Sequence, residues 1–267
     1  MFKATNTSQQ PYYDPWLLAA RNASLLGFTY SGAKNRLAKD ILPHMPHRGR
    51  IYCEPFAGLA ALYWKMALAA DYEQWRLNDI RTAPFLRTLF TRGNALEVPA
   101  RSHEEFARQK AAFALGDPAA ILLGPYFSFN GGFYDKGERQ DKGSITAPSY
   151  EARLRMSHAI MSLTQPAVTA VDWKVAIADL GPQDFVYFDP PYADCRVGSY
   201  RANDIIHEEL VEKLLKAPYN WLLSEYEHPI YARLGKPCWR KEVQLRTTNF
   251  RDDGGKGRRL ECLWRNY

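Results

Sequence analysis

The sequence contains little cysteine, no long apolar run and no apolar core near its N-terminus. The four cysteines, Cys53, Cys195, Cys238 and Cys262, stand far apart, with no Cys-x-x-Cys pair and no Cys/His cluster. That spacing argues against a zinc site and fits reduced thiols in the cytoplasm. No apolar run approaches the ~18 residues that cross a bilayer, and residues 1–10 are too polar for a secretory signal. We therefore expect a cytoplasmic protein that requires no metal.

The composition is that of an ordinary globular protein. The chain has 267 residues, of which 46% are hydrophobic and 24% charged, which excludes the disordered and fibrous classes. This length suits one large domain or one domain that carries an insertion. The formal net charge of +6 favours a polyanionic partner through counterion release, although charge alone is weak evidence for nucleic-acid binding.

Apolar runs and helical stretches alternate in two parts of the chain. A buried strand at 50–53, a helix ending near residue 70 and a strand at 75–78 form the first half of a doubly wound nucleotide-binding sheet. The later predicted elements are a helix at 150–163, strands at 167–171 and 185–188, a helix at 207–216 and strands at 219–223, 238–247 and 259–265. We predict an α/β fold with helices on both faces of a mostly parallel sheet.

Residues 84–150 interrupt this alternation. They hold a helix at 103–115, a glycine- and aromatic-rich stretch at 126–134 and a charged turn at 135–144. We interpret them as an inserted module. The predicted catalytic domain then comprises residues 1–83 and 151–267. Within it, 1–27 form an N-terminal extension that ends in a short helix and includes the apolar stretch 16–20.

The tetrapeptide Asp-Pro-Pro-Tyr at residues 189–192 carries the strongest chemical signal. It follows the apolar run 185–188, so it stands at the carboxyl end of a strand, where open α/β sheets bind ligands. Two consecutive prolines hold the backbone in a fixed extended shape. The Asp189 carboxylate and the Pro190 carbonyl can therefore point at one small region. The alternative interpretation of the tetrapeptide is a rigid loop with no chemical role.

Two converging acceptors suit one particular reaction. An aromatic amine is a poor nucleophile because its lone pair is delocalised into the ring. Acceptors that hold both amine hydrogens would favour the tetrahedral nitrogen that attacks a methyl sulfonium. Tyr192 would offer a face on which an extruded base could stack.

These residues resemble the Dam-like adenine-specific DNA methylases, whose motifs run in the order cofactor region, target recognition and catalytic region. The tetrapeptide at 189–192 matches their catalytic motif, and residues 54–58 match their cofactor motif until its second glycine, which is Ala60 here. Gly-Ala-Lys at 32–34 and the C-terminal residues 261–267 also resemble family motifs. Where the family has Ser-Asn after a late strand, this chain has Ser-Glu at 224–225. The resemblance runs from about residue 28 to the end.

The resemblance implies a site-specific DNA methyltransferase with a Rossmann-like AdoMet-dependent methyltransferase fold and an inserted target-recognition module at 84–150. Its cofactor would be S-adenosylmethionine (AdoMet), and its product S-adenosylhomocysteine. It would extrude adenine from the duplex and methylate N6 directly. The catalytic residues are predicted to be Asp189, Pro190, Pro191 and Tyr192.

Several residues are candidates for holding AdoMet. Asp79 lies 21 residues after Gly58 at a strand end, where it could bind the ribose hydroxyls or simply cap the next helix. Asp172 and Trp173 follow another strand, and we expect them to grip the adenine, with core packing of Trp173 as the competing interpretation. Lys34 is a candidate for the cofactor carboxylate or is a surface residue. The predicted cofactor set is Tyr30, Lys34, Glu54, Pro55, Phe56, Ala57, Gly58, Asp79, Ile80, Asp172, Trp173 and Asp189.

The predicted partner is double-stranded DNA. Residues 130–134 resemble the family's loop near the target base, and basic residues after it could contact phosphates. Residues 246–259 hold five basic and two acidic side chains, a net +3 that fits either DNA contact or a solvated hairpin tip. The predicted DNA-binding set is Asn130, Tyr134, Arg139, Lys142, Arg251, Lys256 and Arg258. A cognate restriction nuclease is left open as a partner, and we expect a monomer or weak dimer of bacterial or phage origin.

Two alternatives stay open. The acceptor could be cytosine N4 or adenine in RNA, although Asp189 favours adenine in DNA. The chain could also be a catalytically silent DNA-binding module, for which Ala60 and Glu225 are the arguments and the intact catalytic motif is the counter-argument. Methyl transfer to duplex DNA, RNA and adenine-free DNA separates these possibilities.

Overall fold

The computed structural model describes residues 26–30, 32–135, 137–139, 145–193, 207–244 and 257–267. Five features named above lie outside these ranges: the apolar stretch 16–20, Lys142, Cys195, Arg251 and Lys256. None of the helices in the described ranges combines the length and apolar character needed to cross a bilayer.

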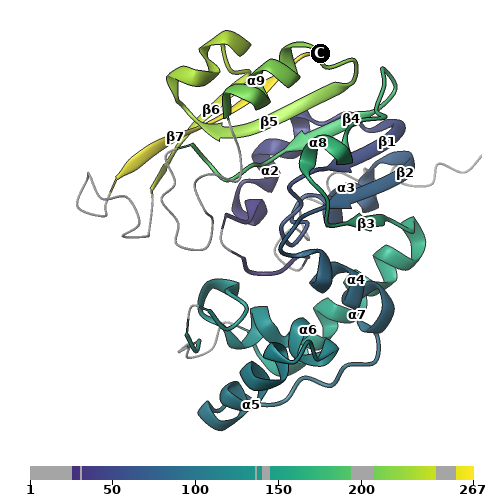
Figure 1. The fold of residues 1–267 in the computed structure, drawn as a ribbon, viewed down its shortest axis with the longest axis vertical. Coiled ribbons are helices and arrows are strands. Elements are labelled where there is room, and N and C mark those ends of the chain that lie inside the picture. Colours follow the sequence, from purple (N-terminus) through teal and green to yellow (C-terminus); the bar gives the residue numbers. More distant parts are fainter. Residues whose placement is uncertain (1–25, 31, 136, 140–144, 194–206, 245–256) are drawn as a thin grey trace, which may run out of the picture.

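The described strands form one seven-stranded sheet with the order β3-β2-β1-β4-β5-β7-β6 (Figure 1). Strands β1 to β5 run parallel, and β7 runs antiparallel to both of its neighbours. The strands are β1 (Arg48–Glu54), β2 (Asp71–Asn78), β3 (Ala167–Thr169), β4 (Phe185–Phe188), β5 (Asn220–Tyr226), β6 (Trp239–Gln244) and β7 (Arg258–Arg265). The order reverses between β1 and β4, which is the switch point of a doubly wound sheet.

Helices cover both faces of the sheet. One face packs against α2, α3, α4 and α7, and the other against α8, α9 and η4. The helices are η1 (Lys34–Arg36), α2 (Ala38–Ile41), η2 (Leu42–His44), α3 (Tyr63–Ala69), α4 (Ala83–Arg92), α5 (His103–Ala114), α6 (Pro118–Phe127), η3 (Phe129–Gly131), α7 (Ala147–Thr164), α8 (Trp173–Ala176), α9 (His207–Leu215) and η4 (Pro229–Leu234). The predicted Rossmann-like α/β fold is confirmed.

The strand sequences explain this layering. All four residues of β4 are buried, and alternate side chains face opposite layers: Tyr187 joins one core and Val186 the other. A continuous apolar run is what a parallel strand covered on both faces requires. Each fully buried Val, Leu or Phe side chain contributes about 1.5–3 kcal/mol relative to exposure. The two cores together therefore fix the sheet between its helices.

Helices α4 to α7 fill the chain between β2 and β3 and lie below the sheet in Figure 1. Among the described residues of this part, here called the helical region (83–164), one isolated bridge between Ser128 and Glu138 is the sole strand-like pairing. Three of its helices begin at side-chain caps, Ser102 for α5, Asp117 for α6 and Thr146 for α7. Its core is continuous with one layer of the sheet, because Phe28 packs edge-on against both Phe85 and Tyr150.

Two local predictions differ from the structure. The sequence predicts one basic helix from the glycine turn at 32 to about 42, whereas the chain forms three short pieces, η1, α2 and η2. Pro43 lies within the last piece, and Lys34 turns inward and is buried. The sequence also predicts a helix soon after Gly58, but α3 begins only at Tyr63. Gly58 and Ala60 have φ angles of +53° and +57°, which no α-helix accommodates.

Candidate active site

The predicted catalytic and cofactor segments meet at the switch point of the sheet. Strands β1 and β4 are parallel neighbours, so the loop 54–58 after β1 and the tetrapeptide 189–192 after β4 leave the same edge side by side. Glu261 of β7 pairs with Tyr226, the last residue of β5, and therefore lies at this edge. Parallel strands place their carboxyl ends together, which is why residues far apart in the sequence share this site.

A buried ionic cluster surrounds the tetrapeptide. The Lys34 ammonium lies 2.7 Å from an Asp189 carboxylate oxygen and 3.9 Å from a Glu261 oxygen. It also stands 4.5 Å from the centroid of the Tyr192 ring, whose hydroxyl donates to Glu261 at 2.5 Å. The Asp189 side chain is 18% exposed, whereas those of Lys34 and Glu261 are 8% and 3% exposed. Asp189 is thus the member of the cluster that is most open to a ligand.

Burial and charge act against each other in this cluster. Burial raises the pKa of the Asp189 carboxyl to about 6, and the attraction of Lys34 keeps that pKa from rising further. Burial alone would lower the pKa of Lys34, but attraction to Asp189 and Glu261 outweighs it and raises the pKa. Asp189 therefore changes charge close to neutral pH, while Lys34 stays protonated.

Glu54 lies at the end of β1 and is 2% exposed. It accepts a hydrogen bond of 2.5 Å from the Tyr52 hydroxyl. Burial raises the pKa of Glu54 to about 8, with the Tyr52 hydrogen bond acting in the opposite direction. Glu54 consequently favours its neutral form at neutral pH. In this structure its side chain is bonded to Tyr52 inside the protein.

The loop after β1 is tied to the end of β2. The Ala57 amide donates to the Asn78 carbonyl at 2.9 Å, and the Gly58 amide donates to the Asp79 carboxylate at 2.9 Å. The Thr82 hydroxyl bonds the Gly58 carbonyl. Gly58 needs its positive φ for this turn, and its position beside the Tyr30 ring leaves its backbone near the open edge.

Asn78 was not singled out from the sequence, yet it joins three strand ends. Its side-chain nitrogen donates to the carbonyls of Pro55 and Val171, each at 3.0 Å. Its oxygen accepts from the Thr169 hydroxyl at 2.7 Å and from the Val171 amide at 3.0 Å. An asparagine at a strand end is too common to signal such a role without the fold.

Asp79 has the capping role that the sequence left as an alternative. One carboxylate oxygen accepts from the amides of Arg81 and Thr82 at 2.8 and 2.9 Å, which fixes the turn into α4. The other accepts from Gly58. A carboxylate has about four lone-pair sites, so these contacts leave acceptor capacity for a ligand hydroxyl.

Three of the predicted cofactor residues differ in exposure. Ile80 is 67% exposed and Asp172 is exposed, and Val171, which was not among the predicted residues, is 37% exposed beside Asp172. Trp173, by contrast, is 5% exposed and packs against Phe56 and Phe188, with ring centroids 5.9 and 6.4 Å away. In this structure the indole therefore packs in the core, while Ile80 and Val171 offer apolar surface to a ligand.

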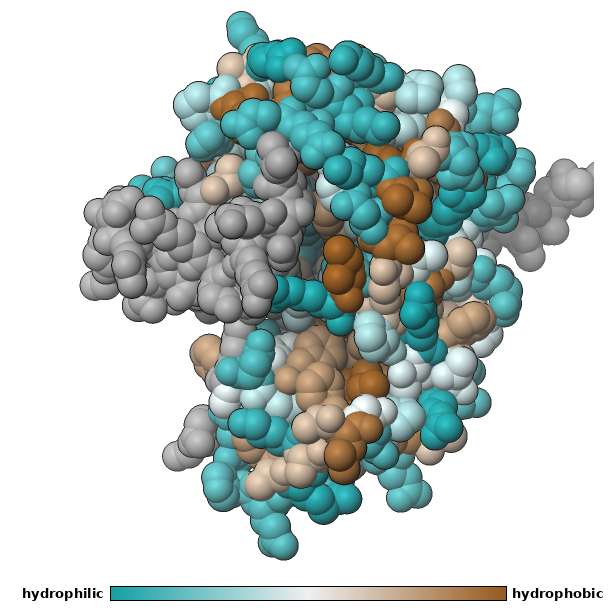
Figure 2. All heavy atoms as spheres, viewed as in Figure 1, coloured by the Kyte–Doolittle hydropathy of each residue, from teal (hydrophilic) through white to brown (hydrophobic). Residues whose placement is uncertain are grey.

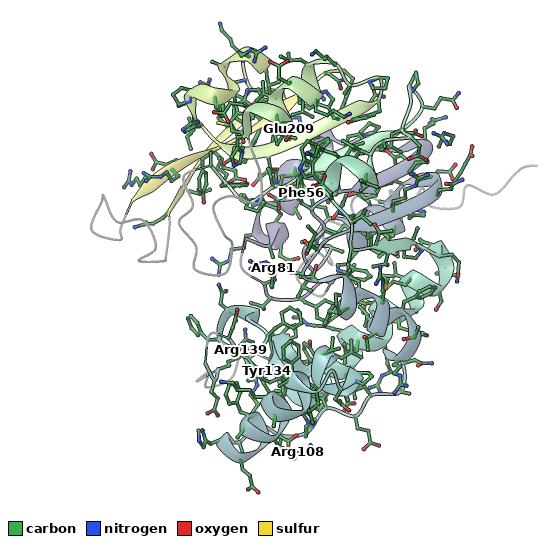
Figure 3. All side chains as sticks on the ribbon, in the orientation of Figure 1. Phe56, Arg81, Arg108, Tyr134, Arg139 and Glu209 are labelled. Carbon is green, nitrogen blue, oxygen red and sulfur yellow. The ribbon has the colours of Figure 1, made fainter. Side chains whose placement is uncertain are left out.

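Tyr30 lies between the sheet and the helical region. Its ring is 6.0 Å from that of Phe133 and borders a pocket of about 310 Å³. Arg81 also borders this pocket, and Figure 3 shows it between the two parts of the molecule. Figure 2 shows hydrophobic residues near the junction of the sheet and the helical region, whereas the outer surface over the sheet is mainly hydrophilic. The aromatic lining suits a planar ring.

The predicted DNA-binding residues within the described ranges lie in different settings. Asn130 is half-buried and has a φ angle of +51°. Tyr134 is 3% exposed and donates to the Ala120 carbonyl at 3.0 Å, so it belongs to the core of the helical region. Arg139 is half-buried nearby (Figure 3), and Arg258 is exposed and pairs with Glu242 at 3.0 Å.

Comparisons with known proteins bear on this site. Residues 30–85 match the family model of the D12 class N6 adenine-specific DNA methyltransferases. The predicted resemblance is thereby confirmed over this segment, which contains Lys34, the loop after β1 and Asp79.

Solved structures similar to the chain include two candidate methyltransferases. A candidate RNA methyltransferase from Pyrococcus horikoshii has a TM-score of 0.43 and 10% identity, covering 97% of this chain and 98% of its own. A candidate methyltransferase complexed with SAH has a TM-score of 0.39 and 12% identity, covering 88% of this chain and 52% of its own. The curated proteins give no match.

Proposed function

We propose that the chain transfers a methyl group from AdoMet to the N6 amine of adenine in DNA. The observation that carries this proposal is the convergence at the switch point: the most exposed member of a buried ionic cluster, Asp189, stands beside the segment that matches the methyltransferase family. An ionised Asp189 is an acceptor held in low-dielectric surroundings, where it can bind an amine hydrogen before the nitrogen attacks.

AdoMet fits the residues at the neighbouring strand ends. Gly58 allows close backbone approach, Asp79 retains acceptor capacity for ribose hydroxyls, and Ile80 presents an exposed apolar face for a purine. The exposed Asp172 carboxylate can accept from the adenine amine, while its Oδ1 caps α8. When bound, AdoMet would supply an electrophilic methyl group on a sulfonium.

The residues of the chain would prepare the target amine. Asp189 would accept one amine hydrogen and the Pro190 carbonyl the other, which favours attack by the nitrogen lone pair. The new nitrogen–carbon bond would form as the sulfur–carbon bond breaks, S-adenosylhomocysteine would be the leaving group, and the surplus amine proton would pass by way of Asp189 to solvent. A base that stacks on Tyr192 would take the place that the Lys34 ammonium holds over that ring. Lys34 would thus keep Asp189 ionised until the base, extruded from the duplex, replaces it.

The helical region would position the DNA. Its loop 129–135 lies beside Tyr30 and the cofactor segment, and Arg139 follows that loop. The overall charge of +6 supports a polyanionic substrate. We keep target recognition by residues 84–150 as part of this proposal.

Methyl transfer from labelled AdoMet tests the assignment. Purified protein is incubated with unmethylated duplex DNA, with a matched duplex that lacks adenine and with RNA of the same sequence. The proposal expects label only in the adenine-containing duplex, and digestion to nucleosides should return N6-methyladenine. Label in RNA, in the adenine-free duplex or in cytosine would refute it, and base-resolution sequencing of the product would give the recognised site.

A further inference from the structure

A second buried carboxylate, Glu225, lies behind the catalytic tetrapeptide. It stands near the end of β5, is 1% exposed, and is, with Ala60, one of two positions at which the sequence departs from the family motifs. One of its oxygens, Oε2, accepts from the Ala193 amide at 3.3 Å and from the Tyr231 hydroxyl at 3.1 Å. The other accepts from the Tyr226 amide at 2.8 Å. Three donors thus converge on one carboxylate.

The contacts of Glu225 continue to the start of α9. The Tyr231 hydroxyl in η4 donates a hydrogen bond to Glu225. The oxygen of the same hydroxyl can therefore accept a hydrogen bond from His207 Nδ1, 2.6 Å away. His207 is the first residue of α9, and Ala193 follows Tyr192 directly. Residues 193 and 207 are therefore connected through one carboxylate: Ala193 directly, and His207 through Tyr231.

We propose that Glu225 is a positioning residue for the methyl-transfer reaction, holding the Asp189–Tyr192 loop through Ala193 and linking it to Tyr231 and His207. This inference rests on the proposed function for its effect on rate, but the hydrogen-bond chain itself does not. Burying a carboxylate is strongly unfavourable unless its hydrogen bonds are satisfied. A carboxylate at this place is therefore informative, because an apolar side chain would complete the strand at lower cost.

The chain offers matched variants. Glu225→Gln keeps the size of the side chain but has a single acceptor oxygen, so its amide group faces at least one of the three donors and loses that contact. Tyr231→Phe removes the hydrogen bonds of that hydroxyl to Glu225 and to His207, and it leaves the Ala193 contact in place. Tyr72→Phe is the control, because it deletes another buried tyrosine hydroxyl, bonded to the Pro46 carbonyl at 2.8 Å, on the strand β2 and far from Glu225 in the sheet order.

Two NMR readouts need neither cofactor nor DNA. In Glu225→Gln, the Ala193 amide should exchange with solvent faster by about tenfold or more, because its acceptor is weakened. The His207 ring resonances should move in Glu225→Gln and in Tyr231→Phe, and stay in place in Tyr72→Phe. Unchanged Ala193 exchange or unmoved His207 resonances in Glu225→Gln would overturn the proposal, whatever the activity of the protein.

Kinetics supply the third readout. The single-turnover rate per folded molecule should fall by about tenfold or more in Glu225→Gln and less in Tyr231→Phe, with AdoMet affinity within about twofold. The double variant should resemble Glu225→Gln, because both changes break one chain. A normal rate per folded molecule in Glu225→Gln would contradict the proposal. If the wild-type protein did not methylate DNA, the proposed function would be wrong. The NMR readouts alone would then decide whether Glu225 holds the loop.

Discussion

The carboxyl edge of the sheet and the helical region bury different kinds of polar side chain. The buried ionisable residues in the described ranges, Lys34, Glu54, Lys65, Asp184, Glu225 and Glu261, all belong to the sheet part of the chain. The helical region buries Gln109, Ser128 and Ser157, which are neutral, together with many aromatic and aliphatic side chains. The two parts share one continuous hydrophobic core. The need for a hydrophobic core is therefore common to both and does not explain why their buried polar side chains differ.

Buried charge is costly, and its location is therefore informative. Removing an ion from water costs several kcal/mol even after relaxation, unless partners and hydrogen bonds compensate. Four of these six buried ionisable residues lie in or beside the switch-point segments: Lys34, Glu54, Glu225 and Glu261. Perturbed charges concentrate where chemistry needs them. Under the proposed function, the sheet edge would perform the reaction and the helical region would contribute shape and substrate contact.

The largest effect should follow from Asp189→Ala. This change removes the proposed amine acceptor, so methyl transfer should fall by at least about a thousandfold, while thermal unfolding and AdoMet binding stay close to those of the parent. Asp40→Ala is the matched control, because Asp40 is paired at 2.6 Å with Lys241 away from the switch point. Normal turnover in Asp189→Ala would break the assignment of chemistry to the sheet edge.

Lys34→Met should shift the pH dependence of the reaction. Asp189 accepts only when ionised, and its pKa is raised by burial to about 6 while Lys34 holds it down. Turnover of the parent should therefore decline as the pH falls through about 6. Without the ammonium the pKa must rise, so the acidic limb moves to higher pH and activity partly recovers in alkaline buffer.

The exposed Lys39 on the neighbouring α2 provides the control for this charge change. Lys39→Met should leave the pH–rate profile where it is, because its side chain faces solvent. An acidic limb that moves to lower pH in Lys34→Met would show that Lys34 does not act on Asp189.

A smaller effect, confined to DNA binding, is expected in the helical region. Arg139→Ala should weaken binding to all duplexes by a few-fold and reduce the salt slope by about one, with AdoMet affinity unchanged. Arg108→Ala is the control, since Arg108 pairs with Glu105 at 2.6 Å and lies at the far end of this region (Figure 3). If Arg139→Ala changed AdoMet affinity but not DNA affinity, the division of roles between the two parts would be wrong.

Local sequence patterns predicted the sheet and the place of the tetrapeptide at the end of β4, because both depend on short-range signals. The strand 185–188 is an apolar run followed by prolines, and the structure gives it the predicted bounds. Side-chain partners could not be predicted in this way. The contact of Lys34 with Asp189 joins residues separated by 155 positions, and whether Trp173 faces a ligand or the core depends on Phe56 and Phe188. Only the folded chain settles which of two reasonable roles such a residue takes.

The smallest prediction concerns Ala60, at the place where the family motif has glycine. Ala60 is fully buried and has a φ angle of +57°, a conformation that costs a non-glycine residue roughly 1–2 kcal/mol. Ala60→Gly relieves this strain but gains entropy in the unfolded chain, so we expect a net stabilisation of about 0.5 kcal/mol, measured by urea unfolding.

Ala61→Gly is the matched control, because Ala61 is not among the residues with positive φ in the described ranges. It should lose stability, since glycine there adds freedom to the unfolded chain without relieving strain. If Ala60→Gly were also destabilised, the methyl group of Ala60 would contribute more through packing than the backbone loses through strain. The strained turn after β1 would then serve core packing rather than close approach of the backbone to a cofactor. The proposed contrast between a reactive sheet edge and a helical region without chemistry would be weaker at that loop.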